Sequence, residues 1–251
     1  GYYFRVNMSS DTFLPGIKDW QKEMFEIIRQ RPDVRFYLLT KRVPMIKDAL
    51  PDDWNDGYEN VELHMTIENQ KNFDERWPIF KDIPAKHKGI NIAPMLGPVD
   101  ITPALESGQM ELINLGGEGF GGNRECRYEW IKKVSDDCEK YKVNFEVNSL
   151  GTNFVKDGKR YNLKGQSLQG KQAYLSHLSK YFYKPKYKLY DPYDHHLLSD
   201  DELVKYPYNS YKCVYCSSFE NCIGCQKCGN CRKVNLVSYE DILNIRKQNN
   251  I

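Results

Sequence analysis

Six of the eight cysteines lie in one short segment near the C-terminal end of the chain. They follow the pattern Cys213-x2-Cys216-x5-Cys222-x2-Cys225-x2-Cys228-x2-Cys231. Thiolates crowded in this way indicate one local metal site rather than a disulfide framework. Zinc favours four thiolates, usually from two CxxC pairs that a longer stretch of sequence separates. Tandem CxxCxxC spacing is typical of the iron-sulfur clusters of ferredoxins. The spacing therefore favours an iron-sulfur cluster, and zinc is the alternative.

A second candidate site is the glycine-rich segment that follows the apolar run at residues 112–115. Its sequence is Gly116-Gly117-Glu118-Gly119-Phe120-Gly121-Gly122-Asn123, and a helical pattern continues through Trp130. A buried strand followed by glycines and a helix is the βα unit of a parallel sheet. Two interpretations stay open, because such a loop either binds a ligand through its backbone N–H groups or only changes the direction of the chain. The loop does not match the dinucleotide fingerprint.

Charged side chains also follow other predicted strands. Lys41 and Arg42 come after the apolar run at residues 34–39, where two fixed cations suit a carboxylate or phosphate group, or form a solvated pair. Four further polar side chains fall at or near predicted strand ends: Glu68, Glu118, Glu146 and Asn148. Because the carboxyl ends of parallel strands meet at one edge, we expect these side chains to converge. His64 alternates with apolar residues and is expected to be structural, and His195 and His196 are expected to be exposed.

Strand-like runs alternate with helical patterns along the first two thirds of the chain. Six strands are predicted, at residues 1–7, 34–39, 61–67, 90–93, 112–115 and 143–147, and Asp157-Gly158 predicts a hairpin turn. This alternation predicts an α/β fold, a parallel (β/α) barrel or partial barrel of TIM-like type, with a small cysteine-rich metal-binding appendage at the C-terminal end.

Three regions follow from this pattern. Residues 1–163 are the predicted barrel, which begins in mid-fold and is expected to lack its first strand. Residues 164–207 are predicted to close the barrel and then form a polar linker. Residues 208–251 are the predicted metal-binding tail.

The composition excludes few functions. The 36 basic and 34 acidic residues give a net charge of +2, which makes no global case for nucleic acid or an anionic membrane surface. No apolar run approaches the roughly 20 residues that span a bilayer, and no signal peptide opens the chain. We therefore expect a cytoplasmic protein without a membrane partner.

Five segments in unbroken order resemble a phage- and prophage-associated family of unknown function. They are FYLLTKR at 36–42, residues 61–70 ending in TIENQ, PMLGPVD at 94–100, LGGEG at 115–119, and the helical pattern at 130–138. The family resembles the radical SAM barrels, near the spore photoproduct lyase group, and the match covers residues 1 to about 163.

The resemblance implies a binding site for S-adenosylmethionine (SAM). By this resemblance the Gly116-Gly117-Glu118 loop faces the methionine end of SAM, and Thr40, Lys41 and Glu68 line the same mouth. Two departures stand out: the chain has no cysteine before Cys126, whereas radical SAM enzymes hold their cluster with an early three-cysteine motif, and residues 146–149 (EVNS) replace an expected Lys-Gln.

Two hypotheses follow. The first is a radical SAM-like enzyme or enzyme fragment whose tail binds an auxiliary iron-sulfur cluster, with SAM as a small-molecule cofactor and a nucleic acid or protein as a conceivable substrate. The second is a non-catalytic barrel whose zinc-binding tail contacts a protein or nucleic acid partner. Residues 1–163 do not identify the substrate.

Overall fold

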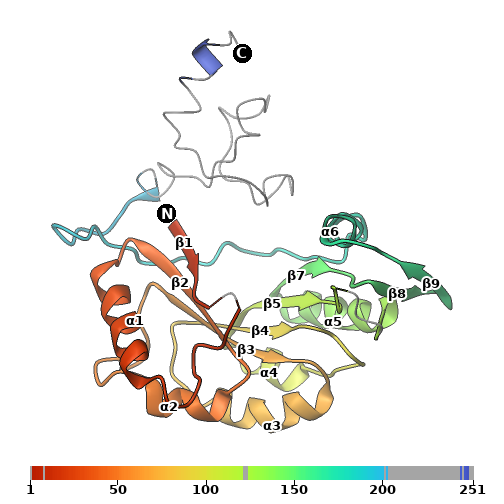
Figure 1. Cartoon of the computed structure of the whole chain (residues 1–251), viewed down its shortest axis with the longest axis horizontal. Coiled ribbons are helices and arrows are strands. Elements are labelled where there is room, and N and C mark those ends of the chain that lie inside the picture. The colour runs from red at the N-terminus through yellow and green to blue at the C-terminus, as the bar shows by residue number, and fades with distance from the viewer. Residues whose placement is uncertain are drawn as a thin grey trace.

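A computed structural model describes residues 2–7, 9–120, 124–200, 202, 244 and 246–248 of the chain (Figure 1). The six clustered cysteines at 213–231 lie outside these residues, so the metal-binding tail stays a prediction. Within the described residues, no helix combines the length and the apolar character that a membrane crossing requires.

The central element is a six-stranded sheet in the order β1-β2-β3-β4-β5-β7, curled into a half-barrel (Figure 1). Every neighbouring pair in it is parallel, as predicted. Its strands are β1 (Tyr2–Arg5), β2 (Val34–Thr40), β3 (Val61–Ile67), β4 (His87–Ile92), β5 (Met110–Gly116) and β7 (Asn144–Ser149). The six predicted strands are therefore confirmed, with ends shifted by up to three residues.

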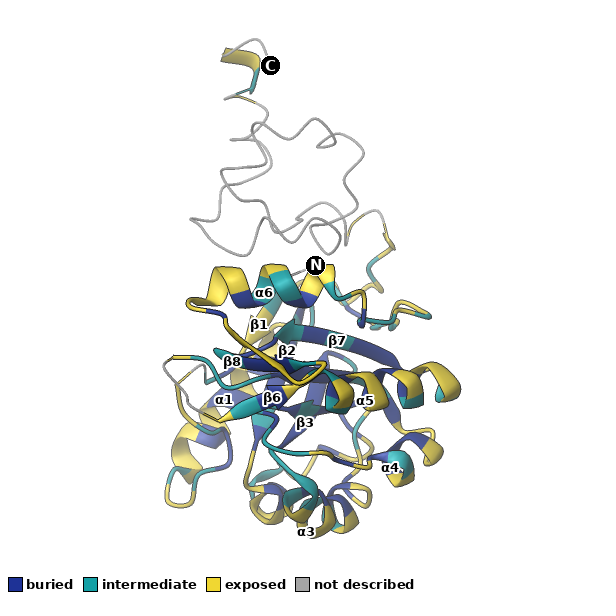
Figure 2. Cartoon of the chain, turned by 90° about the vertical axis from the view of Figure 1, so that its right-hand side faces the viewer, coloured by how far each residue is buried: buried dark blue, intermediate teal, exposed yellow. Residues whose placement is uncertain are grey.

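The helices that precede α6 (Gln166–Leu175) in the chain lie on the convex side of this sheet (Figure 1 and Figure 2). They are α1 (Lys18–Gln30), α2 (Ile46–Ala49), which follows the 3-10 turn η1 (Val43–Met45), α3 (Gln70–Phe80), α4 (Thr102–Glu106) and α5 (Tyr128–Tyr141). The side chain of Asn69 caps α3 by accepting a hydrogen bond from the backbone N–H of Asn72. Because neighbouring strands are parallel, each crossover returns the chain to the amino edge of the sheet. The loop that follows each strand therefore lies at the carboxyl edge.

The core lies between the sheet and these helices because alternate strand residues point to opposite faces. The buried apolar residues that point toward the helices include Leu38, Leu63, Met65, Ile67, Ile90, Ile92, Ile113, Leu115 and Phe145. Burying each side chain of this size contributes roughly 1.5–3 kcal/mol. The residues between them therefore point to the concave face, where no helix of the α1–α5 set lies.

A second, three-stranded sheet has the order β6-β8-β9 and consists of β6 (Glu125–Arg127), β8 (Asn153–Lys156) and β9 (Lys159–Asn162). The predicted hairpin is confirmed, because β8 and β9 are antiparallel and both Asp157 and Gly158 have positive φ. Strand β6 was not predicted: the sequence there was assigned to a loop and a helix start. Its three residues are too few to show an alternating pattern.

Residues after the hairpin cover part of the concave face. Helix α6 (Gln166–Leu175) packs against β7 on the side opposite α5 (Figure 2). Residues 180–190, which we call the strap, then cross the amino ends of the strands: Lys180 pairs with Phe145, and the N–H of Tyr190 donates to the carbonyl of Pro32. The strap covers the amino end of the concave face. None of its described residues reaches the carboxyl end.

Candidate functional site at the carboxyl edge of the half-barrel

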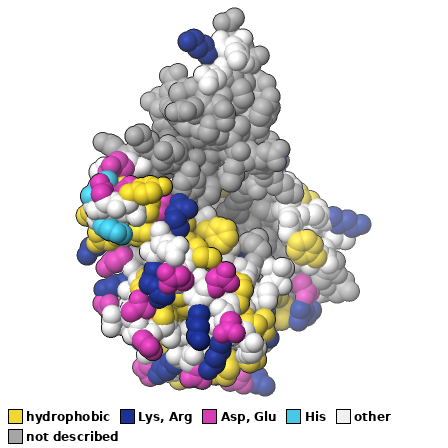
Figure 3. Space-filling view, turned by 60° about the vertical axis from the view of Figure 1, so that its left-hand side comes forward, with side chains coloured by type: hydrophobic (Ala, Val, Ile, Leu, Met, Phe, Trp, Pro, Cys, Tyr) yellow, Lys and Arg dark blue, Asp and Glu magenta, His cyan; other side chains and the backbone are white. Residues whose placement is uncertain are grey.

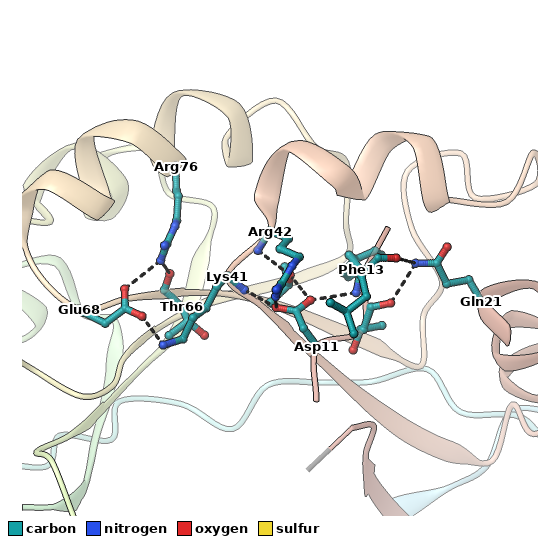
Figure 4. A network of polar contacts seen from close by, with 11 residues as sticks. Asp11, Phe13, Gln21, Lys41, Arg42, Thr66, Glu68 and Arg76 are labelled. Atoms are coloured by element: carbon teal, nitrogen blue, oxygen red, sulfur yellow. Dashed lines mark hydrogen bonds and ion pairs between the residues drawn. The ribbon is translucent and has the colours of Figure 1, made fainter. Parts of the chain in front are cut away.

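Asp11, in the loop after β1, organises the start of the site (Figure 4). Its carboxylate accepts hydrogen bonds from the hydroxyl of Thr40 at 2.6 Å and from the backbone N–H groups of Phe13 and Lys41, both at 2.9 Å. The guanidinium of Arg42 lies 3.2 Å from the same carboxylate. These contacts hold the loop after β2 against the loop after β1. Thr40 is buried and connects the two loops through its hydrogen bond to Asp11.

Glu68, directly after β3, joins two cations. One of its carboxylate oxygens pairs with the ammonium of Lys41, and the other lies 3.0 Å from the guanidinium of Arg76 on α3. Arg76 also donates to the carbonyl of Thr66 at 2.6 Å. Lys41 and Glu68, which the sequence assigned to one mouth, are therefore in direct contact (Figure 4).

Glu118 forms a third cluster in the loop after β5. Its carboxylate pairs with the guanidinium of Arg124 and accepts the backbone N–H of Arg124 at 3.2 Å. The hydrogen bond from Arg124 lowers the pKa of Glu118, and the same bond raises the pKa of Arg124. The charge of Glu68 contributes to the raised pKa of Arg124, so the two clusters belong to one electrostatic environment.

Gly117, directly after β5, and Gly151, after β7, let two backbone segments pack closely. A Cβ on Gly117 would lie 2.4 Å from the carbonyl oxygen of Leu150, and one on Gly151 would lie 2.8 Å from the backbone nitrogen of Glu118. The N–H of Gly117 donates to the carbonyl of Ser149 at 3.0 Å. The close backbone approach at Gly117 is thus to the loop after β7. A substitution at Gly117 will therefore disturb this loop.

Behind this edge, the concave face carries a buried polar network. His64 is fully buried, and its Nε2 lies 2.7 Å from Glu62 while its Nδ1 lies 2.9 Å from Oδ1 of Asn91. The hydroxyl of Tyr37 donates to the same Oδ1 at 2.7 Å, and the ring of Tyr37 covers the imidazole with centroids 4.6 Å apart. His64 is a fully hydrogen-bonded structural histidine.

Gly89 makes room for this arrangement. A Cβ at Gly89 would lie 2.1 Å from Cε1 of His64 and 2.5 Å from the carbonyl oxygen of Leu112. The imidazole therefore lies directly over the backbone of β4, in space that only glycine leaves empty.

Glu146 and Asn148, which the sequence places at or near a strand end, lie on the same concave face. The strand register places Glu146 beside Asn114 within β7 rather than after it, so Glu146 lies farther from the edge than predicted. Asn148 donates from Nδ2 to Oδ1 of Asn114 at 3.5 Å. His195 and His196 are exposed, as expected.

Sequence reasoning missed the concave network, including Tyr37, Glu62, Asn91 and Asn114. The signal was present as polar residues at every second position of β3, namely Glu62, His64 and Thr66, between apolar ones. Alternation alone does not show whether such a face meets solvent or the inside of a half-barrel. The contact between Tyr187 of the strap and Glu62 joins residues 125 positions apart, which no local pattern indicates.

The two cysteines among the described residues do not contribute to this edge. Cys126 lies in β6 and Cys138 in α5, and both are buried and free. Burial raises the pKa of the Cys126 thiol to about 12 and raises that of Cys138 as well. Both are therefore thiols at neutral pH, which makes them poor metal ligands.

The fold and this edge define the class: an α/β protein with a parallel half-barrel, whose βα loops bring charged groups from four strand ends to one edge. A comparison with protein-family models matches residues 2–175, most of the chain, to a family described as protein of unknown function (DUF5131). The chain belongs to this family. Comparisons with curated proteins and with solved structures gave no match.

Proposed function

We propose that this chain is a radical SAM-like enzyme or enzyme fragment, and that its carboxyl edge binds the methionine end of SAM. The observation that carries the proposal is that three separate βα loops bring Lys41, Glu68 and Glu118 to one edge, beside the polar concave face. In barrel enzymes this edge is where ligands bind and react.

The charges of the edge suit a zwitterion. The methionine end of SAM carries a carboxylate and an ammonium group, which Lys41 or Arg42 and Glu68 or Glu118 complement. The side chains of Lys41 and Arg42 are 48% and 44% exposed, so both cations are accessible to a ligand. A ligand carboxylate would exchange one ion pair for another, which limits the desolvation cost of binding.

The described residues do not fit an iron-sulfur cluster at this edge, because their two cysteines are buried elsewhere as thiols. In radical SAM enzymes such a cluster supplies the electron that cleaves SAM. No catalytic step through a cluster follows from the described residues. The auxiliary cluster at Cys213 to Cys231 is part of the proposal and rests on cysteine spacing alone.

The test is a calorimetric titration of SAM into the anaerobically purified protein and two variants. We expect saturable binding to the wild type and about tenfold weaker binding to Lys41→Met, because an ionic hydrogen bond to the ligand is lost. Lys71→Met is the matched control, since its ammonium is exposed on α3 and makes only a loose 3.9 Å pair. The absence of wild-type binding would refute the proposal.

The second candidate is the non-catalytic barrel with a zinc-binding tail that contacts a protein or nucleic acid. One observation favours it: all three acids of the edge already have cationic partners within the protein, as in a structural network. Basic and acidic side chains are interspersed on the face shown in Figure 3, without an extended basic patch, which favours a protein over a nucleic acid partner on that face. Stoichiometric zinc without SAM binding is the outcome that selects this function.

A further inference from the structure

A row of amide and carboxylate side chains crosses the concave face beside the charged edge. The strand register aligns Thr66 with Asn91, Asn91 with Asn114, and Asn114 with Glu146. Asn91 and Glu146 are half-buried, and the strap covers the opposite end of the same face. This row therefore forms a polar floor between the strap and the carboxyl edge.

Asn91 is held in one orientation by its neighbours. Its Oδ1 accepts hydrogen bonds from the hydroxyl of Tyr37 at 2.7 Å and, more weakly, from Nδ2 of Asn114 at 3.4 Å, and it lies 2.9 Å from Nδ1 of His64. Burial raises the pKa of Tyr37, which keeps its hydroxyl protonated as a donor. An oxygen that already contacts three polar groups has no capacity left for a ligand.

The opposite end of the same amide is unused. Nδ2 of Asn91 has no hydrogen-bond partner among the described residues, and it is absent from the buried atoms that lack one, so it is not fully buried. Asn148 shows the complementary situation, since its Nδ2 donates to Asn114 and its Oδ1 is unused. The floor thus offers one oriented donor and one acceptor on rigid strands.

Cations lie at the same level of the half-barrel. Lys41 comes one residue after Thr40, which pairs with Met65, so Lys41 aligns with Thr66 and lies two strands from Asn91. Two strand spacings correspond to about 10 Å between backbones, a gap that the lysine side chain shortens. The edge as a whole holds four cations, Lys41, Arg42, Arg76 and Arg124, against three acids, Asp11, Glu68 and Glu118.

We propose that the half-barrel binds a nucleotide as its substrate, with the edge of the base on Asn91 and Asn148 and the phosphate on Lys41 and Arg42. A nucleobase edge presents an acceptor for Nδ2 of Asn91 and a donor for Oδ1 of Asn148. A phosphate matches the two cations Lys41 and Arg42, whose side chains are 48% and 44% exposed. The alternative, that the network merely fills the concave face, leaves the unused ends of both amides without a role. This inference rests on the proposed ligand-binding role of the edge and names the substrate class.

The experiment measures binding of the nucleoside 5′-monophosphates, the matching nucleosides, inorganic phosphate and a short single-stranded oligonucleotide to the full chain without SAM. We expect at least one mononucleotide to saturate the protein, its nucleoside to bind more weakly, and phosphate alone to bind weakest. Tighter binding of the oligonucleotide would identify a nucleic acid as the source of the same nucleotide. Failure of every mononucleotide and of the oligonucleotide to saturate at millimolar concentration overturns the inference.

The decisive variant is Asn91→Asp, which retains an oxygen for Tyr37 and His64 and converts the free donor into an acceptor. We expect about tenfold or greater loss of affinity for both the nucleotide and the nucleoside. Asn55→Asp adds the same charge at an exposed turn and controls for electrostatic repulsion of the phosphate. If Asn91→Asp does not fold, Asn148→Ala tests the acceptor in the same way.

Unchanged binding by the folded variant refutes the assignment. Because SAM is absent from these titrations, their outcome is independent of the SAM experiment. Nucleotide binding without SAM binding retains this inference and rejects the radical SAM-like function. SAM binding without nucleotide binding rejects this inference and retains the radical SAM-like function.

Discussion

Tyr187 and Glu62 connect the strap to the sheet: the hydroxyl of Tyr187 donates to Oε2 of Glu62 at 3.0 Å. The other oxygen of this carboxylate contacts His64 at 2.7 Å, and the ring of Tyr187 packs against that of His87 in a tilted arrangement with centroids 4.0 Å apart. One buried carboxylate thus holds both the strap and the histidine that orients Asn91.

The first prediction concerns this carboxylate and pH. Burial opposes ionisation of Glu62, but the charge and hydrogen bond of His64, with the bond from Tyr187, outweigh it and lower the pKa of Glu62 below its usual 4.5. A carboxyl group with a lowered folded-state pKa stabilises the fold above its unfolded-state pKa and loses this contribution as pH falls. We expect the free energy of unfolding, measured with urea, to decrease below about pH 4.5.

Glu62→Gln should lower the free energy of unfolding at pH 7 by about 3 kcal/mol, because it breaks a buried ionic pair. Its acid dependence should also be flatter than that of the wild type. Glu75→Gln, at an exposed position, is the control and should behave like the wild type. Parallel acid dependence of Glu62→Gln and the wild type would show that Glu62 is not the titrating group.

The second prediction concerns the glycine-rich loop. Gly117→Ala should cost about 2 kcal/mol of stability or more, since its Cβ would overlap the backbone of Leu150 and Gly151. Gly97→Ala is the matched control at the same edge, because a Cβ there meets no atom within 4 Å. Thermal unfolding of the two variants decides the matter, and equal melting temperatures would contradict the close packing at Gly117.

The third prediction concerns the two buried cysteines. With their thiol pKa values raised by burial, Cys126 and Cys138 should resist iodoacetamide at pH 8 in the native protein and react after denaturation. Peptide mass spectrometry measures the modification at each site. Rapid native-state labelling of either cysteine would mean that its thiol is accessible and more acidic than its burial implies.

The sequence was sufficient to predict the six parallel strands, because the apolar run at residues 34–39 and the apolar/polar alternation at residues 61–67 are clear strand patterns. It was also sufficient to bring Lys41 and Glu68 to one edge, since parallel topology dictates that placement. The concave network was not predictable, because the reach of Tyr37 to Asn91 depends on strand register and on the space above Gly89. Pairing of Glu118 with Arg124 likewise depends on a loop conformation without periodicity.

The fourth prediction concerns the cysteine-rich tail. Between Lys212 and Arg232 the sequence offers only Val214, Tyr215, Phe219 and Ile223 for packing. This is too little apolar area to offset roughly 1–2 kcal/mol of backbone ordering per residue, so metal must supply the folding free energy. Iron, sulfide and zinc analysis of anaerobically purified protein should show iron and sulfide, and serine substitution of Cys222, Cys225 or Cys228 should remove them. A colourless protein with stoichiometric zinc would reject the cluster.

The most direct test of the central claim is amide chemical-shift mapping of the isotope-labelled protein during a SAM titration. We expect the shift changes to concentrate on the backbone N–H groups at 40–42, 68–69 and 116–119, and to leave the strap at 180–190 unchanged. Such a pattern would place the ligand at the carboxyl edge. The absence of shift changes at saturating SAM, or changes confined to the strap and the amino edge, would contradict the account.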